Sequence, residues 1–298
     1  MSVYSKDIEE FKSSSGYTIE GLWYPRVTRI VDMKSKPALL KFYATMGYDR
    51  AQLISKQSAR EGTMVHEAVE ALLLGKSPTM NGKMAPSVEA FLEFIEKNKI
   101  KVIDESHVER LVHHKEHKYA GTLDVLATIG GKFGVLDIKT SEGIYRDYNL
   151  QTAAYMGALM NEFPDIKTRW ILRIDQSQQC LRCGASLRTK GGRKKVRLAN
   201  GSGHLFKNGF HAHYGVSRAC EDDEHDWGPA KGVVELKEIT DDWEEDFKAF
   251  LAAKTLWEWE NKKWLKELRW IYNKICPGRD KFCYILWWLL LVFRIEDV

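Results

Sequence analysis

The chain has 298 residues, a formal net charge of +4 and a hydrophobic content of 44%. That length allows one large domain or two smaller ones, and the apolar content excludes a chain that is disordered throughout. The surplus of 45 basic over 41 acidic residues is small, so it permits a polyanionic partner without requiring one.

The first third of the chain predicts helices. Three segments place apolar residues at helical spacing, namely Val27–Met46, Ala51–Leu74 and Ser87–Lys97. Gly75, with Pro78 beyond it, is a typical end for the second helix. The N-terminus, Met1–Phe11, is polar and charged, so we expect no secretory signal and a cytoplasmic location, in a prokaryotic or phage-infected cell.

The middle of the chain changes to short runs rich in Val, Ile, Leu and Thr, which predict an antiparallel meander from about Val102. The polar stretch His113–Lys118 and the pair Gly130–Gly131 interrupt these runs where turns would fall. A helix and two further strands are then predicted at Asn149–Asn161, Arg169–Ile174 and Gly232–Ile239.

The segment between the last two strands, residues 176–231, is rich in Gly, Lys, Arg, His and Cys and lacks periodicity. A structureless loop of that length is unusual in a compact domain, so we predict an inserted module that separates residues 1–175 from residues 232–298 of one core. Asp241 or Asp242 is predicted to cap a long helix through about Asn273. Its tryptophans, which we interpret as core residues that could also stack on bases, are Trp257, Trp259, Trp264 and Trp270.

The apolar run Phe282–Phe293 is a dozen residues long, which is shorter than the roughly 20 residues that a helix needs to cross a bilayer. We therefore interpret it as buried or interfacial and expect no membrane partner.

The most informative stretch is Tyr119–Ser141, two strand-like runs joined at a Gly-Gly pair that suits a two-residue type I′ turn. Such a turn fixes the register and pairs Ile129 with Lys132. Counting outward predicts two further cross-strand pairs, Asp124 with Asp137 and Thr122 with Lys139.

Side chains alternate along a strand, so Lys139 should share one face with both aspartates. Leu123, Val125, Leu136 and Ile138 should then share the apolar face. Carboxylates in directly opposed positions lie about 4.5–5.5 Å apart at Cβ, which destabilises the hairpin unless a cation or a shared proton relieves the repulsion.

A hard divalent ion such as Mg²⁺ or Mn²⁺ suits this oxygen-rich pair, because it keeps open positions that can bind a phosphate. A lysine beside it could orient the attacking water and neutralise charge on a scissile phosphate. An exposed hairpin with a solvated charged face is the alternative for an isolated Asp-x-Lys triplet. The matched second aspartate and two flanking motifs favour the metal site.

The flanking motifs lie on predicted helices. His66 and Glu70 are one turn apart on the helix before the meander, where His66 could bind a metal or be an ordinary surface histidine. Gln151 and Tyr155 are four residues apart on the helix that follows, so both can face one groove.

Together these residues resemble the RecB-like branch of the PD-(D/E)xK nucleases. Its pattern is a histidine on a helix, an aspartate on a strand, D/E-x-K on the next strand and Q-x-x-x-Y on the following helix. The segments GTLDVLA, VLDIKTS and NLQTAAYMGAL resemble in particular the mitochondrial genome maintenance exonucleases and their phage and bacterial relatives. These also carry a G-T-x-x-H-E segment and an early V-T-x-I-like segment, here Val27–Val31. The resemblance covers roughly residues 24–175 and returns more weakly in the helix near Asp242.

The resemblance implies an α/β fold with a restriction-endonuclease-like core, in which a central mixed sheet is flanked by helices. It implies a Mg²⁺ or Mn²⁺ site whose ligands are His66, Asp124, Asp137 and the carbonyl of Ile138. Lys139 would be the catalytic lysine, and Gln151 and Tyr155 would position the substrate. Glu70 and Glu109 are expected to lie behind the ligands.

The implied function is a metal-dependent exonuclease on single-stranded or end-bearing DNA in replication, repair or recombination. The alternatives are a DNA-binding or assembly factor that keeps the fold without catalysis, and a structure-specific endonuclease. Several RecB-like nucleases hold an iron–sulfur cluster with one cysteine ahead of the nuclease motifs. No cysteine precedes Cys180 in this sequence, so that cluster is not expected.

The inserted module carries a second candidate metal site. Cys180 and Cys183 form a C-x-x-C-G motif typical of a zinc knuckle, and Cys220 and His225 could supply the remaining ligands. Other candidates for the fourth ligand are His204, His211 and His213. The motif predicts a structural Zn²⁺ in a small zinc-ribbon-like insert, with free thiols as the alternative.

The same module is strongly basic. Its cations near the motif are Arg182, Arg188, Lys190, Arg193, Lys194, Lys195 and Arg197. They could grip a nucleic-acid backbone through salt-sensitive contacts, or form a solvated charge run on a loop. The sequence leaves both interpretations open.

Overall fold

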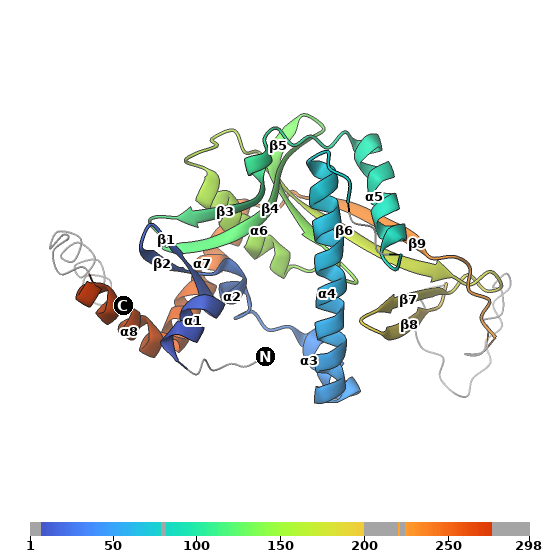
Figure 1. Ribbon diagram of the computed structural model, residues 1–298, viewed down its shortest axis with the longest axis horizontal. Helices are drawn as coiled ribbons and strands as arrows, with labels where there is room; N and C mark the ends of the chain where they lie inside the picture. The colour runs from blue at the N-terminus through green and yellow to red at the C-terminus, as the bar shows by residue number, and fades with distance from the viewer. Residues whose placement is uncertain (1–6, 79–81, 200–219, 221–223, 276–298) are drawn as a thin grey trace.

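The computed structural model describes residues 7–78, 82–199, 220 and 224–275 (Figure 1). The apolar run Phe282–Phe293 lies outside the described residues, as do Cys276, Cys283, His204, His211 and His213. Within the described ranges, no helix has both the length and the apolar character that a bilayer crossing requires.

A mixed sheet forms the centre of the molecule. In spatial order its main strands are β3 (Val108–His114), β4 (Tyr119–Ile129), β5 (Lys132–Lys139), β6 (Thr168–Gln179) and β9 (Lys231–Ile239). Strands β5 and β6 run parallel and are connected by α6 (Asp147–Leu159), because parallel neighbours need a crossover. The other neighbours run antiparallel. The predicted α/β architecture, a central mixed sheet flanked by helices, is confirmed.

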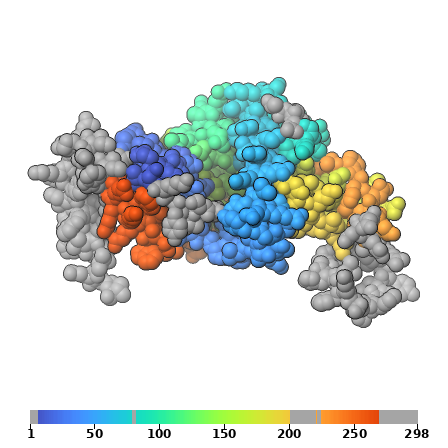
Figure 2. Space-filling view, turned by 60° about the horizontal axis from the view of Figure 1, so that its bottom comes forward, coloured from blue at the N-terminus to red at the C-terminus, as the bar shows by residue number. Residues whose placement is uncertain are grey.

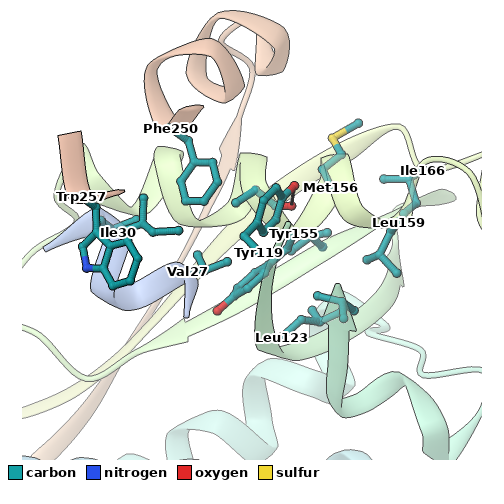
Figure 3. Close-up of a cluster of buried hydrophobic side chains, with 14 of the residues drawn as sticks. Val27, Ile30, Tyr119, Leu123, Tyr155, Met156, Leu159, Ile166, Phe250 and Trp257 are labelled. Atoms are coloured by element: carbon teal, nitrogen blue, oxygen red, sulfur yellow. Dashed lines mark hydrogen bonds between the residues drawn. The ribbon is translucent and has the colours of Figure 1, made fainter. Parts of the chain in front are cut away.

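One face of the sheet is covered by α2 (Val27–Val31), α6 and α7 (Trp243–Glu260), which Figure 3 shows in close-up. Val27 and Ile30 of α2, Tyr155 of α6 and Phe250 of α7 contribute fully buried side chains to this cluster. Full burial of such a side chain contributes about 1.5–3 kcal/mol to stability. This layer fixes α6, and hence Tyr155, against the sheet.

The other face is covered by α4 (Tyr48–Leu73) and α5 (Ala85–Asn98). Val65 and Val69 of α4 share a buried cluster with Ile138 of β5, and Phe91 of α5 is completely buried in the same cluster. The apolar residues of α4 therefore lie at helical spacing on its sheet-facing side, which also brings His66 close to the end of β5.

The N-terminal part and the chain's last helix contain elements that the sequence did not predict or predicted differently. Before β3, the unpredicted elements are α1 (Ile8–Ser15), β1 (Gly16–Ile19), β2 (Leu22–Pro25) and a 3₁₀ turn, η1 (Glu105–His107). The segment predicted as one helix from Val27 is two, because Pro37 starts α3 (Pro37–Met46) separately.

The predicted long C-terminal helix is also two helices, α7 and α8 (Lys262–Ile275). The Asp242 carboxylate caps the start of α7 by accepting from the Glu244 amide at 2.9 Å, as the sequence predicts. At Asn261 the side-chain amide donates to the Trp257 carbonyl at 2.8 Å, which satisfies the helix end. Trp257 is a core residue as predicted, whereas Trp259 is exposed.

The inserted module begins later than its sequence boundary indicates, because β6 continues through Gln179 and pairs with β9 as far as Ser177 and Lys231. Beyond that point β7 (Ser186–Lys190) and β8 (Arg193–Arg197) form a hairpin that pairs with the last residues of β6. The hairpin lies on the same side of the molecule as α3 and the lower part of α4 in Figure 1.

The turn between β4 and β5 has the predicted geometry. Gly130 and Gly131 adopt φ values of 59° and 78°, which only glycine adopts readily at two successive positions. Ile129 pairs with Lys132, and the predicted register of the hairpin is therefore confirmed next to the turn.

Candidate active site

The β4–β5 hairpin brings its two aspartates together where the strands begin to separate. Regular pairing runs outward from the turn as far as Val125 and Leu136, so Asp124 and Asp137 occupy the next position on each strand. There the Asp124 Oδ2 atom accepts a hydrogen bond from the Ile138 amide at 2.6 Å. The Asp124 side chain thus takes the hydrogen bond that a backbone carbonyl of the neighbouring strand would accept, and the Ile138 amide fixes its carboxylate.

The predicted pairing of Thr122 with Lys139 is wrong. Thr122 pairs with Leu111 of β3, and Lys139 pairs with Arg173 of β6. The reason is the separation of β4 from β5 at the aspartates, beyond which each strand continues with its other neighbour.

Strict alternation of side chains along β4 is also interrupted. Leu123 packs with α2 and α6, whereas Val125, two residues later, packs with α4 and α5. The predicted single apolar face is therefore wrong for Leu123, although its side chain is fully buried. The interruption falls at Asp124, opposite Glu109 in the β3–β4 register. Glu109 has a φ of +48°, so the backbone is distorted on both strands where the two carboxylates face each other.

Asp137 and Lys139 form a buried ion pair, with 2.5 Å between Lys139 Nζ and Asp137 Oδ2. Asp137 Oδ2 contacts Lys139, whereas the buried Oδ1 has no hydrogen-bond partner among the described residues, so the lone pairs of Oδ1 are available. Burial raises the pKa of Asp137 to about 6, although the charge of Lys139 opposes that shift. Burial lowers the pKa of Lys139, but the charges of Asp137 and Asp124 outweigh it and raise that pKa above its usual value. Lys139 is therefore a cation.

Side chains from three different elements converge beside this pair. His66 of α4, Glu109 of β3 and Asp124 of β4 each offer a ligand atom, and these atoms lie within 4.8 Å of one another. Burial and the charge of Lys139 lower the pKa of His66 to about 4, so its imidazole is neutral and can bind a metal. Burial and the charge of Glu70 raise the pKa of Glu109 to about 7. We call His66, Glu109, Asp124, Asp137 and Lys139 the carboxylate cluster.

The cluster differs in one respect from the predicted ligand set. Glu109, expected behind the ligands, lies among the converging atoms, whereas Asp137 is outside that group of three. The Ile138 carbonyl is close enough to His66 to accept its ring N–H and to raise its pKa slightly. Glu70 lies behind His66 as expected, with 4.0 Å between Glu70 Oε1 and His66 Nδ1.

The residues Gln151 and Tyr155 of α6 lie beside the cluster, as the sequence predicts. Gln151 Nε2 donates to the Tyr155 hydroxyl at 3.1 Å. Burial, followed by the charges of Asp137 and Asp124, raises the pKa of Tyr155. Its hydroxyl therefore stays protonated next to two aspartates and can donate a hydrogen bond to an anion.

A cleft of about 530 Å³ opens along α4 onto this cluster. Its lining includes Ser58, Gly62, His66, Glu70, Glu109 and Thr140. At Gly62, α4 passes close to the end of β5, and a Cβ there would lie 2.8 Å from Thr140 Oγ1 unless that side chain rotated.

Two residues near the cluster, Tyr148 and Lys190, were not assigned to it from the sequence. The ring of Tyr148 lies 5.2 Å from Lys139 Nζ, and Lys190 Nζ donates to the Thr140 carbonyl. The position of Glu109 among the ligand atoms could have been predicted, because counting back from the His114–Tyr119 turn places it opposite Asp124. No sequence pattern places Lys190 near the cluster, because its position depends on how the inserted module folds.

The known proteins to which the chain is similar include exonucleases. No family model matches the chain. The chain is 29% identical over 152 residues to the mitochondrial genome maintenance exonuclease 1 of Mus musculus. The resemblance indicated by the motifs is confirmed. The match covers 46% of this chain and 45% of the mouse protein, so the chain spans about half the length of this exonuclease.

Two crystal structures of an alkaline exonuclease, LHK-Exo from Laribacter hongkongensis, also match, both at 13% identity. The first covers 87% of this chain and 98% of that protein at a TM-score of 0.30. The second, a complex with dAMP, covers 82% and 94% at a TM-score of 0.28.

The inserted module brings together the four residues that the zinc prediction named. Cys180, Cys183, Cys220 and His225 place their ligand atoms within 4.8 Å of one another. The Sγ atoms of Cys180 and Cys220 lie 3.9 Å apart, and Cys183 Sγ lies 3.5 Å from His225 Nδ1. Burial raises the pKa of Cys180, but hydrogen bonds from the Cys183 amide and His225 outweigh it and lower that pKa to about 6, so a thiolate forms readily. We call these four residues the cysteine cluster.

Proposed function

We propose that the chain is a Mg²⁺- or Mn²⁺-dependent deoxyribonuclease that hydrolyses phosphodiester bonds at the carboxylate cluster. The observation that carries this proposal is the convergence of His66, Glu109 and Asp124 within 4.8 Å, beside the buried pair of Asp137 and Lys139. Carboxylates gathered this closely repel one another, and a hard divalent cation relieves that repulsion.

The donor set fits such an ion. Carboxylate oxygens and a neutral imidazole are available, and the buried Oδ1 atom of Asp137 has no hydrogen-bond partner among the described residues. His66, Glu109 and Asp124 would hold the ion, with Asp137 and the Ile138 carbonyl beside them. A bound Mg²⁺ or Mn²⁺ supplies charge neutralisation on the phosphate and activation of a water molecule.

The chain's own groups would complete the chemistry. Lys139, a cation fixed by Asp137 at 2.5 Å, donates to the scissile phosphate and stabilises the charge that grows there. Gln151 and the protonated Tyr155 hydroxyl donate hydrogen bonds that orient the strand. The open cleft along α4 admits a flexible strand, which supports single-stranded or end-bearing DNA as the substrate.

We further propose exonuclease activity in replication, repair or recombination. The name of the mouse relative supports this choice. The experiment compares labelled linear, end-blocked and circular DNA, single- and double-stranded, with Mg²⁺, Mn²⁺ or neither. Loss of linear substrate with survival of circles supports an exonuclease. Cleaved circles would indicate an endonuclease, and binding without cleavage would indicate a non-catalytic factor.

The matched variants are Lys139→Ala and Lys132→Ala, two lysines on β5. Lys132 lies beside the glycine turn and pairs with Glu238 at 2.7 Å, far from the cluster. We expect Lys139→Ala to abolish cleavage and Lys132→Ala to retain it. Equal cleavage by both variants would reject the assignment of the active site.

We also propose a structural Zn²⁺ held by the cysteine cluster. Three sulfur donors and one imidazole form a tetrahedral set that prefers Zn²⁺ to harder ions. Elemental analysis of protein purified without added metal should find about one zinc per chain, and Cys183→Ser should reduce that content. A wild-type chain without bound zinc would reject this site.

A further inference from the structure

The β7–β8 hairpin leaves the sheet and rests its tip on α4. At the tip, the Gly191 amide donates to Glu61 Oε2 at 2.8 Å. Gly191 has a φ of +61°, and a Cβ there would lie 2.4 Å from the Ile54 carbonyl oxygen, so only glycine allows this approach. Figure 2 shows the yellow surface of this part of the chain against the blue surface of α3 and α4.

The register of the hairpin places most of its basic side chains on one face. Arg188 pairs with Lys195, and Lys190 pairs with Arg193. Cross-strand partners point to the same face, and successive pairs alternate between faces. One face therefore carries Arg188, Lys190, Arg193, Lys195 and Arg197, which we call the basic face. Lys194, opposite Thr189, points to the other side.

The carboxylates near the basic face are too few to neutralise it. Arg188 pairs with Asp175 at 2.6 Å, and Lys195 and Arg197 share the single carboxylate of Glu142. The two remaining cations have no described carboxylate within ion-pair distance. Lys190 donates to the Thr140 carbonyl, and Arg193 lies over the ring of Phe42 at 5.2 Å.

The basic face borders the cleft of the carboxylate cluster. Thr140, whose carbonyl accepts from Lys190, lines that cleft and directly follows Lys139. A strand bound at the cluster would therefore pass along the hairpin.

The cysteine cluster lies at the base of the same hairpin. The Cys180 amide donates to the Ala185 carbonyl at 2.7 Å, and the Gly184 amide donates to the Cys180 carbonyl at 2.9 Å. The metal-binding turn is thus bonded to the residue that precedes β7. Lys190 is five residues further along this strand, about 17 Å away at the rise of an extended chain.

We infer that the cysteine cluster holds the β7–β8 hairpin so that its basic face forms a wall of the active-site cleft, where Lys190 and Arg193 bind backbone phosphates of a DNA strand. This inference rests on the proposed nuclease function. The contacts are to phosphates, so they raise affinity for any sequence and release counterions as they form.

The test measures binding of a fluorescein-labelled single-stranded oligonucleotide by anisotropy at several salt concentrations. All proteins carry Lys139→Ala, so that cleavage does not interfere. We expect Lys190→Gln with Arg193→Gln to weaken binding about tenfold or more and to reduce the salt slope by about 1.4, or 0.7 for each lost phosphate contact. Lys194→Gln, on the other face, should keep the slope. An unchanged slope in the double variant would overturn the inference.

A second arm tests the role of the cysteine cluster. In the same background, Cys183→Ser should lose zinc and weaken binding by a similar factor. Full binding by a zinc-depleted Cys183→Ser protein would overturn the link between the cluster and the wall. The two proposals can fail separately. If the protein with an intact Lys139 does not cleave DNA but the double variant still loses binding, the proposed nuclease function is rejected and the phosphate-binding role of the basic face is kept.

Discussion

The two clusters both gather groups that repel one another, but they are built in opposite ways. The carboxylate cluster draws its side chains from four elements, α4, β3, β4 and β5, and opens onto a cleft. The cysteine cluster takes two of its ligands from a single short motif, and sulfur is its main donor. Oxygen ligands around an open position suit a catalytic Mg²⁺ or Mn²⁺, whereas three thiols and one imidazole suit a closed structural Zn²⁺.

Donor chemistry and the number of contributing elements together indicate the role of each cluster. A site assembled from distant elements needs the folded core to exist, so a metal there can exchange without unfolding the chain. A local motif that orders its own module gains stability from its metal. Selective disruption of each cluster should therefore produce distinct losses.

The largest effect is expected from Asp124→Asn. The variant keeps the shape of the side chain but removes a charge from the proposed metal site, so cleavage should fall by about 10³-fold or more. Zinc content should stay at the wild-type value, because the cysteine cluster is untouched. Single-turnover cleavage and elemental analysis measure the two outcomes.

The control for that experiment is Asp165→Asn, which changes an exposed aspartate outside both clusters. It should cleave as the wild type does. Comparable cleavage by the Asp124 and Asp165 variants would contradict the assignment of Asp124.

The next largest effect is expected from removal of zinc with a thiol-preferring chelator. The backbone amide hydrogens of β7 and β8 should then exchange with solvent about a hundredfold faster, because the metal no longer holds the base of the β7–β8 hairpin. The amides of β4 and β5 should keep their protection. Hydrogen exchange followed by mass spectrometry reads both regions in one sample. Uniform loss of protection would show that the insert and the core form one cooperative unit.

A smaller effect concerns pH. The pKa values of Asp137 and Glu109, at about 6 and about 7, lie above those of unfolded chains. The metal-free folded state therefore binds more protons, and its stability falls as pH rises from about 4 through 7. A divalent ion needs the deprotonated groups, so it should stabilise the protein more at pH 8 than at pH 5.5.

Thermal unfolding with and without Mn²⁺ at the two pH values checks this sign. The gain from Mn²⁺ should be larger at pH 8 by roughly 1–2 kcal/mol, which corresponds to about one pKa unit of linked protonation. Glu109→Gln should reduce the difference. A gain from Mn²⁺ that is equal at both pH values would show that these carboxylates do not bind the ion.

Much of this arrangement could be predicted from the sequence, because its signals are local. The glycine pair fixed the β4–β5 register, and the spacing of Gln151 and Tyr155 placed both on one side of α6. The C-x-x-C motif and His225 likewise indicated the cysteine cluster, since ligand type and spacing carry that information.

The rest depends on tertiary structure. Leu123 and Val125 point to different faces because the backbone is distorted at Asp124 and Glu109. The regular alternation of side chains along a strand does not predict such a distortion. The place of Lys190 depends on where the hairpin tip meets α4. Long-range packing of this kind leaves no pattern in the sequence of either partner.

The smallest expected effect is a difference between the variants of two buried tyrosines, Tyr119 and Tyr155. Tyr119 donates from its hydroxyl to the Ala154 carbonyl at 2.8 Å, inside the core, whereas the Tyr155 hydroxyl faces the aspartates and receives the Gln151 amide. Tyr119→Phe removes the hydroxyl's hydrogen bond to this buried carbonyl and should lower stability by about 1–2 kcal/mol with cleavage retained. Tyr155→Phe should lower cleavage by roughly tenfold, about 1.4 kcal/mol, with a smaller change in stability. Chemical denaturation and single-turnover kinetics on both variants measure the contrast. The reverse pattern would mean that Tyr155 supports the core rather than the bound strand.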